Sequence, residues 1–209
     1  MILKYNTLDQ LDLRNNNLQR LPAPLDLPNL VQLYLGGNPA LHQDETWALL
    51  GQLPILRILG LHAMNLGQIP EPILNYGQLM ALDLSDNPLP SLPVGLYQLT
   101  NLEVLNIAQT QLVTLPAVVN QLPQLKVLYV DACPGLSLSQ TLERVAELPL
   151  EVLSARQLPL DKLPEALPTI RARELWVGDA ETDLEVLDDL EGQLPYTQVS
   201  TNPTHQYGD

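Results

Sequence analysis

The chain has 209 residues, enough for one sizeable domain, and 45% of them are hydrophobic although only 4% are aromatic and none is phenylalanine. The formal net charge of −14, from 24 acidic and 10 basic residues, argues against binding to nucleic acid or to an anionic membrane surface. The single cysteine excludes an internal disulfide and a multi-cysteine zinc site and suits a reducing compartment. A basic protein partner, or solubility alone, fits this charge better.

One spacing of apolar residues recurs along the chain. In residues 102–112, LEVLNIAQTQL, apolar side chains occupy offsets 1, 4, 6 and 11, which is neither a helical period nor a simple strand period. Eight segments share this spacing, and they begin at Leu8, Leu30, Leu56, Leu79, Leu102, Leu125, Leu150 and Ala172. The pattern predicts eight stacked units, each with a short strand at its LxL stretch.

The units resemble the leucine-rich repeat family, whose pattern is LxxLxLxxNxL, over residues 8–179. In five units an apolar residue and a proline follow, as in bacterial and intracellular signalling members: Leu21-Pro22, Ile69-Pro70, Leu92-Pro93, Leu115-Pro116 and Leu163-Pro164. The resemblance implies an α/β fold, a right-handed leucine-rich-repeat solenoid with a parallel sheet on its concave face. Short helices, 3-10 turns and extended segments are then expected on the convex face.

The two ends of the chain depart from the repeat. Residues 1–7 match the second half of a unit, so we interpret them as a partial repeat or an N-terminal cap. Residues 180–209 predict an acidic capping helix and a mobile tail. The seven acids within residues 179–191 leave a second interpretation open, an acidic helix that docks on a basic partner.

Two insertions within the units predict short helices. Residues 42–54 read as a helix with Asp44 as its N-cap and with Trp47 and Leu50 on one face. Residues 136–149 read likewise.

The ninth residue of each unit has a structural role in the family. There the resemblance implies an inward side chain that hydrogen-bonds the backbone of adjoining turns. In this chain those residues are Asn16, Asn38, Asn87, Thr110 and Cys133. Cysteine is a small substitute with a weak donor, so we expect Cys133 to be a buried and unreactive thiol.

Strand side chains that point away from the core line the concave face of the expected solenoid. Tyrosine and tryptophan there are typical interface anchors. The apolar residues from Ile58 to Val152 either mark a partner site or reflect the strand preference of β-branched residues. We assign partner binding to the following residues of this face: Tyr34, Ile58, His62, Asp83, Asn106, Tyr129, Asp131, Arg156 and Trp176.

The same face contains a possible Ser-His-Asp group. His62 and Ser85 occupy equivalent positions on neighbouring strands, with backbones ~4.8 Å apart, and Asp83 and Asp86 are close. The sequence lacks a nucleophile elbow and any signature of an oxyanion hole. It also lacks phosphate-binding and dinucleotide-binding motifs and spaced metal ligands. We therefore expect no catalytic residue, no metal and no cofactor.

The sequence thus predicts a monomeric, non-enzymatic module that binds a protein partner on its concave face, in the cytoplasm of a bacterial cell. The partner is expected to be a protein, with no nucleic acid and no membrane involved. The first alternative is the recognition domain of a larger bacterial effector or signalling protein, which would be secreted if this chain is a fragment. A hydrolase that uses His62 and Ser85 is the less favoured alternative.

Overall fold

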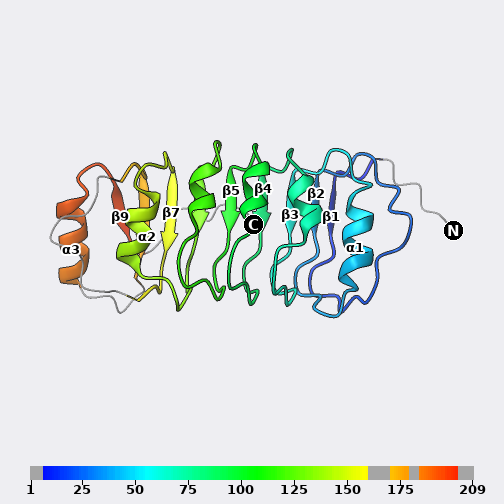
Figure 1. Ribbon diagram of the computed structural model, residues 1–209, viewed down its shortest axis with the longest axis horizontal. Coiled ribbons are helices and arrows are strands. Elements are labelled where there is room, and N and C mark those ends of the chain that lie inside the picture. The colour runs from blue at the N-terminus through cyan, green and yellow to red at the C-terminus, as the bar shows by residue number, and fades with distance from the viewer. Residues whose placement is uncertain (1–6, 160–169, 179–183, 202–209) are drawn as a thin grey trace.

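The computed structural model describes residues 7–159, 170–178 and 184–201, without the side chains of residues 184–187. In this part of the chain one nine-stranded parallel sheet is formed, and every strand pairs with the next one along the chain (Figure 1). The strands are β1 Gln10–Asp12, β2 Gln32–Tyr34, β3 Ile58–Gly60, β4 Ala81–Asp83, β5 Val104–Asn106, β6 Val127–Tyr129, β7 Val152–Ala155, β8 Glu174–Val177 and β9 Gln198–Ser200.

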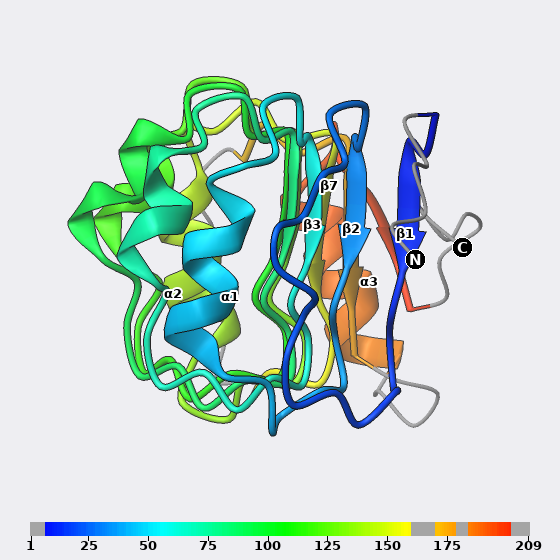
Figure 2. The same ribbon diagram turned by 90° about the vertical axis from the view of Figure 1, so that its right-hand side faces the viewer.

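Helices cover one face of this sheet and leave the other open, while the last helix of the chain lies at the end of the sheet next to β9 (Figure 1). Viewed along the long axis, α1 (Gln43–Leu50) and α2 (Leu138–Val145) lie on one side of the strands (Figure 2). The first and last strands, β1 and β9, lie farther from these helices than the middle strands do. The sheet is therefore curved, with α1 and α2 on its convex side. This arrangement confirms the predicted solenoid.

The repeat sets the register of the strands. Leu33, Leu59, Leu82 and Leu105 are aligned across β2 to β5, and each is at most 1% exposed. Since successive side chains of a strand point to opposite faces, the residues before and after each of these leucines point toward the concave side. Every concave position thus forms a row that runs across the sheet.

Proline residues begin the short 3-10 helices of the convex side. Pro70, Pro93 and Pro116 precede η1 Glu71–Asn75, η2 Val94–Gln98 and η3 Ala117–Gln121 as N-cap residues. Proline lacks a backbone N–H, and the first amides of a helix have no intrahelical acceptor in any case. The predicted apolar-proline corner therefore fits the start of each of these turns.

Two units carry α-helices instead. α1 comprises Gln43–Leu50 and α2 comprises Leu138–Val145, and α3 Leu184–Gln193 follows the last full unit. The prediction of Asp44 as N-cap is wrong. The N-cap of α1 is His42, whose carbonyl accepts hydrogen bonds from the amide and the hydroxyl of Thr46. In α2 the Ser137 hydroxyl accepts from the Gln140 amide at 3.3 Å.

Some expectations for the chain ends differ from the structure or lie outside it. The segment expected to be a mobile tail contains β9, where the Gln198 amide donates to the Arg173 carbonyl at 2.8 Å. Apart from Thr7, the partial repeat expected at residues 1–7 lies outside the described residues, and so does the Leu163-Pro164 corner. No helix in the described part of the chain has the length and apolar character to cross a membrane.

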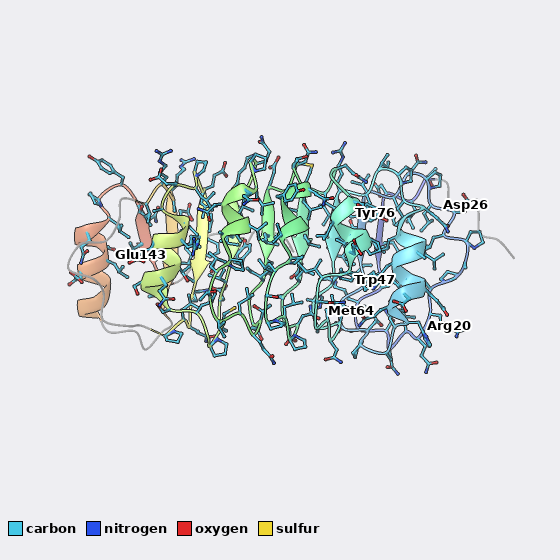
Figure 3. All side chains as sticks on the ribbon, in the orientation of Figure 1. Arg20, Asp26, Trp47, Met64, Tyr76 and Glu143 are labelled. Carbon is cyan, nitrogen blue, oxygen red and sulfur yellow. The ribbon has the colours of Figure 1, made fainter. Side chains whose placement is uncertain are left out.

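Tyr76 has a buried hydroxyl next to the end of α1 (Figure 3). Its side chain is 7% exposed, and the hydroxyl has no hydrogen-bond partner among the described residues. The equivalent residues of the next two units are the buried Leu99 and Leu122. Burial raises the pKa of Tyr76 to about 12.

We predict that Tyr76→Phe leaves the protein as stable at pH 7 or stabilises it by about 1 kcal/mol, because it removes an unpaired buried hydroxyl. In the folded parent the Tyr76 hydroxyl keeps its proton at pH values where the unfolded chain, in which the tyrosine has its ordinary pKa of 10.0, has released it. The stability of the parent should therefore fall as pH rises from about 10 to about 12, and the variant should lack this contribution. Urea denaturation at pH 7 and pH 11 measures both effects, and a less stable variant at pH 7 would contradict them.

Candidate functional site

The concave face contains an open groove with a volume of about 850 Å³ that extends from β2 to β8. Gly60, Ala81 and Ala108 contribute small residues to its lining, while Tyr34 and Tyr129 contribute large ones. Asp83, Asp131 and Arg156 are the charged residues that line it within the described part of the chain.

An arginine and a glycine hold Tyr34 in place at one end of the groove. The guanidinium of Arg14 lies 5.2 Å from the Tyr34 ring centroid, and the Tyr34 hydroxyl donates to Gln32 at 2.9 Å. The ring overlies Gly60, where an added Cβ would lie 2.8 Å from Cδ1 of Tyr34. Glycine at this strand position thus lets the ring lie against the backbone.

Asp12 fixes the arginine that covers Tyr34. Nε and Nη2 of Arg14 donate to the Asp12 carboxylate at 2.7–3.0 Å. The side-chain hydrogen bond from Arg14 is the main reason that the pKa of Asp12 is lowered. Arg14 and Asp12 therefore form an ion pair with no net charge at this end of the face.

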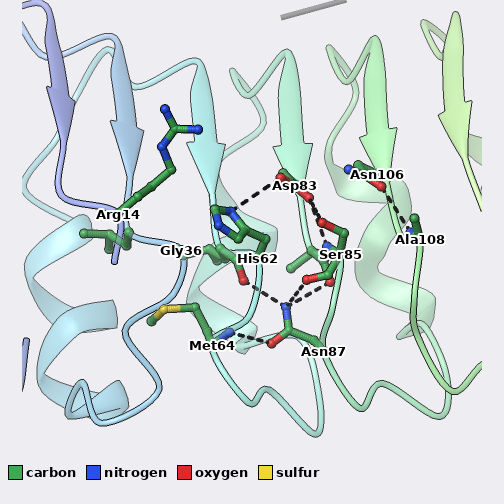
Figure 4. A network of polar contacts seen from close by, with 12 residues as sticks. Arg14, Gly36, His62, Met64, Asp83, Ser85, Asn87, Asn106 and Ala108 are labelled. Carbon is green, nitrogen blue, oxygen red and sulfur yellow. Dashed lines mark hydrogen bonds and ion pairs between the residues drawn. The ribbon is translucent and has the colours of Figure 1, made fainter. Parts of the chain in front are cut away.

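The middle of the face contains His62, Asp83 and Ser85, but not in the order that a hydrolase needs (Figure 4). The Ser85 hydroxyl donates to Oδ1 of Asp83 at 2.7 Å, and His62 Nδ1 lies 3.8 Å from Oδ2 of Asp83. No hydrogen bond joins Ser85 to His62 in the structure as described. The serine proton is directed to the carboxylate rather than to the imidazole that would have to accept it.

Asn106, beside Asp83 on the next strand, makes the same local contact. Its Oδ1 accepts the amide of Ala108 at 3.1 Å, just as Oδ1 of Asp83 accepts the amide of Ser85 at 3.0 Å. Side chains that accept an amide two residues later are typical of Asx turns. Both side chains are therefore held in fixed orientations at the ends of their strands.

A polar network fixes the other end of the groove. Asp131 accepts from the Ser154 hydroxyl at 2.6 Å and from the amide and guanidinium of Arg156 at 2.7–3.4 Å. The Arg156 guanidinium lies 6.0 Å from the Trp176 ring centroid. Sequence reasoning missed Ser154, although its place between Tyr129 and Trp176 in one row marks it as a small residue between two rings.

Trp176 is buried, which corrects the prediction of an exposed anchor. Its side chain is 3% exposed and packs with Val127 and Val152, which are 5% and 1% exposed. Val104 and Tyr129 pack against this cluster and are only partly buried. The apolar stripe expected to face solvent is therefore a second small core at one end, and its open part is formed by Ile58, Ala81 and Val104.

Asparagine side chains join the turns beside the sheet. Asn38 and Asn87 are at most 1% exposed. Oδ1 of Asn87 accepts the amides of Met64 and Leu66, and its Nδ2 donates to carbonyls on both sides. Asn16, in the first unit, is exposed and its side chain donates only to the Arg14 carbonyl among the described residues.

Cys133 continues this row as a buried thiol. It is 0% exposed, and its sulfur lies 3.3 Å from the Ile107 carbonyl, to which it donates, and 3.3 Å from the Thr110 hydroxyl. Burial is the main cause that raises the pKa of this thiol. The burial of the sulfur and the raised pKa both disfavour a reactive thiolate.

We predict that a thiol reagent such as dithionitrobenzoate labels Cys133 in the native protein only as fast as the protein opens. The reaction should be complete within seconds in denaturing urea, which exposes the thiol and serves as the control. Labelling of the folded protein at a rate close to that in urea would show that Cys133 is accessible.

Comparison with known proteins agrees with this architecture. The family model described as "Leucine Rich repeats (2 copies)" matches residues 6–49, and the one described as "Leucine rich repeat" matches residues 77–134. Among curated proteins, no sequence matches the chain significantly.

Two solved structures resemble this one. A leucine-rich repeat protein of Leptospira interrogans is 26% identical with a TM-score of 0.60, and the alignment covers 95% of this chain but 63% of that one. An internalin C2 of Listeria monocytogenes is 20% identical with a TM-score of 0.60, over 81% of this chain and 80% of its own. The second likeness concerns the fold alone, and the chain spans less than two thirds of the Leptospira protein. With two family matches and an in-register stack of repeat strands, the chain belongs to the leucine-rich repeat family.

Proposed function

We propose that the protein is a non-enzymatic module that binds a protein partner in its concave groove. The observation that carries this proposal is the pair of partly exposed tyrosines, Tyr34 and Tyr129, each held by fixed neighbours near one end of the groove. Tyr34 lies between Arg14 and Gly60, and the Tyr129 and Trp176 ring centroids are 6.1 Å apart. Rigid aromatic side chains lose little entropy on binding, which favours a preorganised interface.

The groove itself is only weakly acidic. Its lining includes two carboxylates, Asp83 and Asp131, and one guanidinium, that of Arg156, which pairs with Asp131. Much of the negative charge of the chain therefore lies elsewhere, and it includes the exposed Asp188, Asp189 and Glu191 of α3. This distribution supports a basic partner that is attracted by the field of the whole molecule and recognised by contacts in the groove.

The central polar group supports binding rather than catalysis. Ser85 donates its proton to Asp83, and the face is an open groove rather than a site that excludes water. If any hydrolytic activity is detected, Ser85→Ala should leave it unchanged.

A partner captured from a lysate of the source cells tests the proposal through two double variants. Tyr34→Ala/Tyr129→Ala changes the groove, whereas Val94→Ala/Tyr97→Ala changes two exposed convex residues, 74% and 46% exposed. We expect the groove variant to weaken binding of the captured partner at least about 30-fold, since an aromatic hot spot contributes about 2 kcal/mol or more and about 1.4 kcal/mol is tenfold. The convex variant should bind as the parent does. Equal binding by the parent and the groove variant would overturn the proposal.

A further inference from the structure

Asp83 differs from the other carboxylates of the concave face. Asp12 pairs with Arg14, Asp131 pairs with Arg156, and Glu174 accepts from Nε1 of Trp176 at 3.2 Å. No arginine or lysine forms an ion pair with Asp83 in the described part of the chain, and Arg14 interacts with it electrostatically only from beyond ion-pair distance. Its side chain is 36% exposed and lines the groove near the middle of the sheet.

The two oxygens of Asp83 are not equivalent. Oδ1 accepts both the amide and the hydroxyl of Ser85, at 3.0 and 2.7 Å, which occupies its two lone pairs. Oδ2 accepts no hydrogen bond within the described residues, and His62 Nδ1, at 3.8 Å, is beyond hydrogen-bonding distance. Apart from this longer contact with His62, which is the dashed line between the two side chains in Figure 4, Oδ2 is the fixed carboxylate oxygen that is left for a partner.

We infer that the carboxylate of Asp83 binds a lysine side chain of the partner protein, and binds it in preference to arginine. A guanidinium binds a carboxylate best through two parallel hydrogen bonds that use both oxygens, and Oδ1 of Asp83 is already occupied. An ammonium needs one oxygen at a time. This inference rests on the proposed function of the groove and specifies its chemistry.

The surroundings of Asp83 suit the rest of a lysine side chain. Asn106 is the register partner of Asp83 on β5, ~4.8 Å away, and its Oδ1 accepts one amide, so a lone pair remains for the ammonium. Ala81 and Val104 form the neighbouring row and are partly buried, which gives the methylene groups an apolar path.

Asp83→Asn is a variant that we expect to fold. Asn106 shows that an asparagine at the equivalent place of the next repeat still accepts the amide two residues later. The matched control is Asp86→Asn, which makes the same change of charge three residues away at an exposed turn outside the groove.

The test selects phage-displayed random dodecapeptides on the parent protein and on both variants in parallel. Peptides selected on the parent and on Asp86→Asn should be enriched in lysine over arginine, and those selected on Asp83→Asn should not. By calorimetry, a selected synthetic peptide should bind Asp83→Asn about 10-fold more weakly than the parent, as expected for loss of a hydrogen bond between charged groups. Replacing its lysine by arginine should weaken binding to the parent.

The possible failures are distinguishable. Peptides that lose affinity on Tyr34→Ala/Tyr129→Ala but show no lysine preference, or bind Asp83→Asn as tightly as the parent, would overturn the role of Asp83 and leave the groove as the binding surface. Equal losses of peptide affinity for Asp83→Asn and Asp86→Asn would mean that only the overall charge matters. That result would also overturn the role of Asp83. Failure to recover any peptide sensitive to the tyrosine variant would count against the proposed function itself.

Discussion

Asn87→Ala is expected to lower the free energy of unfolding by about 4 kcal/mol. Asn87 is 1% exposed, and its side chain is bonded to the amides of Met64 and Leu66 and to the carbonyls of Leu61 and Leu84 at 2.8–3.1 Å. Alanine leaves these groups buried without partners, and each unsatisfied buried group costs about 1–3 kcal/mol. Urea denaturation followed by circular dichroism measures the loss.

Asn16→Ala is the matched control for Asn87→Ala, since Asn16 has the same place in the first unit but is exposed and donates one hydrogen bond, to Arg14. Asn16→Ala should lower the free energy of unfolding by about 0.5 kcal/mol. Similar losses for the two variants would mean that the asparagine row does not join the turns as described.

The second large effect is expected for Trp176→Ala, which should lower the free energy of unfolding by about 3–5 kcal/mol. Trp176 packs with the buried Val127 and Val152, and its Nε1 donates to Glu174 at 3.2 Å. Alanine removes the ring that covers these valines and leaves a cavity at one end of the concave face.

Tyr196→Ala is the control for the tryptophan variant because its side chain is 87% exposed, and it should change stability by less than about 0.5 kcal/mol. A loss below about 1 kcal/mol for Trp176→Ala would show that this ring is exposed in solution. Trp176 would then become a candidate anchor for the partner again. Denaturation of both variants under the same conditions separates these outcomes.

The strands were predictable because residues at the same position of consecutive repeats pair with one another in the sheet. Leu33, Leu59 and Leu82 share one place in their units, and the structure aligns them on adjacent strands. Rows of concave residues follow from that alignment and from the alternation of side chains in a strand. Sequence periodicity was therefore enough to place Tyr34, Asp83 and Tyr129 on the same face.

Side-chain contacts within the rows were not predictable from periodicity. Trp176 has an outward position in its strand, yet the valines of the neighbouring row and the ring of Tyr129 give it an apolar place to pack. The pairing of Arg156 with Asp131 across two strands likewise depends on rotamers, which the pattern does not specify. β9 was missed because residues 196–201 lack the two leucines that mark the other strands.

The Asx turn at Asp83, which orients Ser85, was predictable from the sequence. An aspartate or asparagine at the end of a strand commonly accepts the amide two residues later. Asp12, Asp83 and Asn106 all do so, at 3.0–3.1 Å. This local preference places Ser85 next to the Asp83 carboxylate, where the Ser85 hydroxyl donates to Asp83 rather than to His62.

The most direct test of the central claim is site-specific photo-crosslinking to the partner. A benzophenone amino acid replaces Ala81, which lines the groove, or Val94, which is 74% exposed on the convex side. On irradiation with the captured partner, we predict a crosslinked product from position 81 and none from position 94. Crosslinking from position 94 without any from position 81 would contradict the claim that the partner binds in the concave groove.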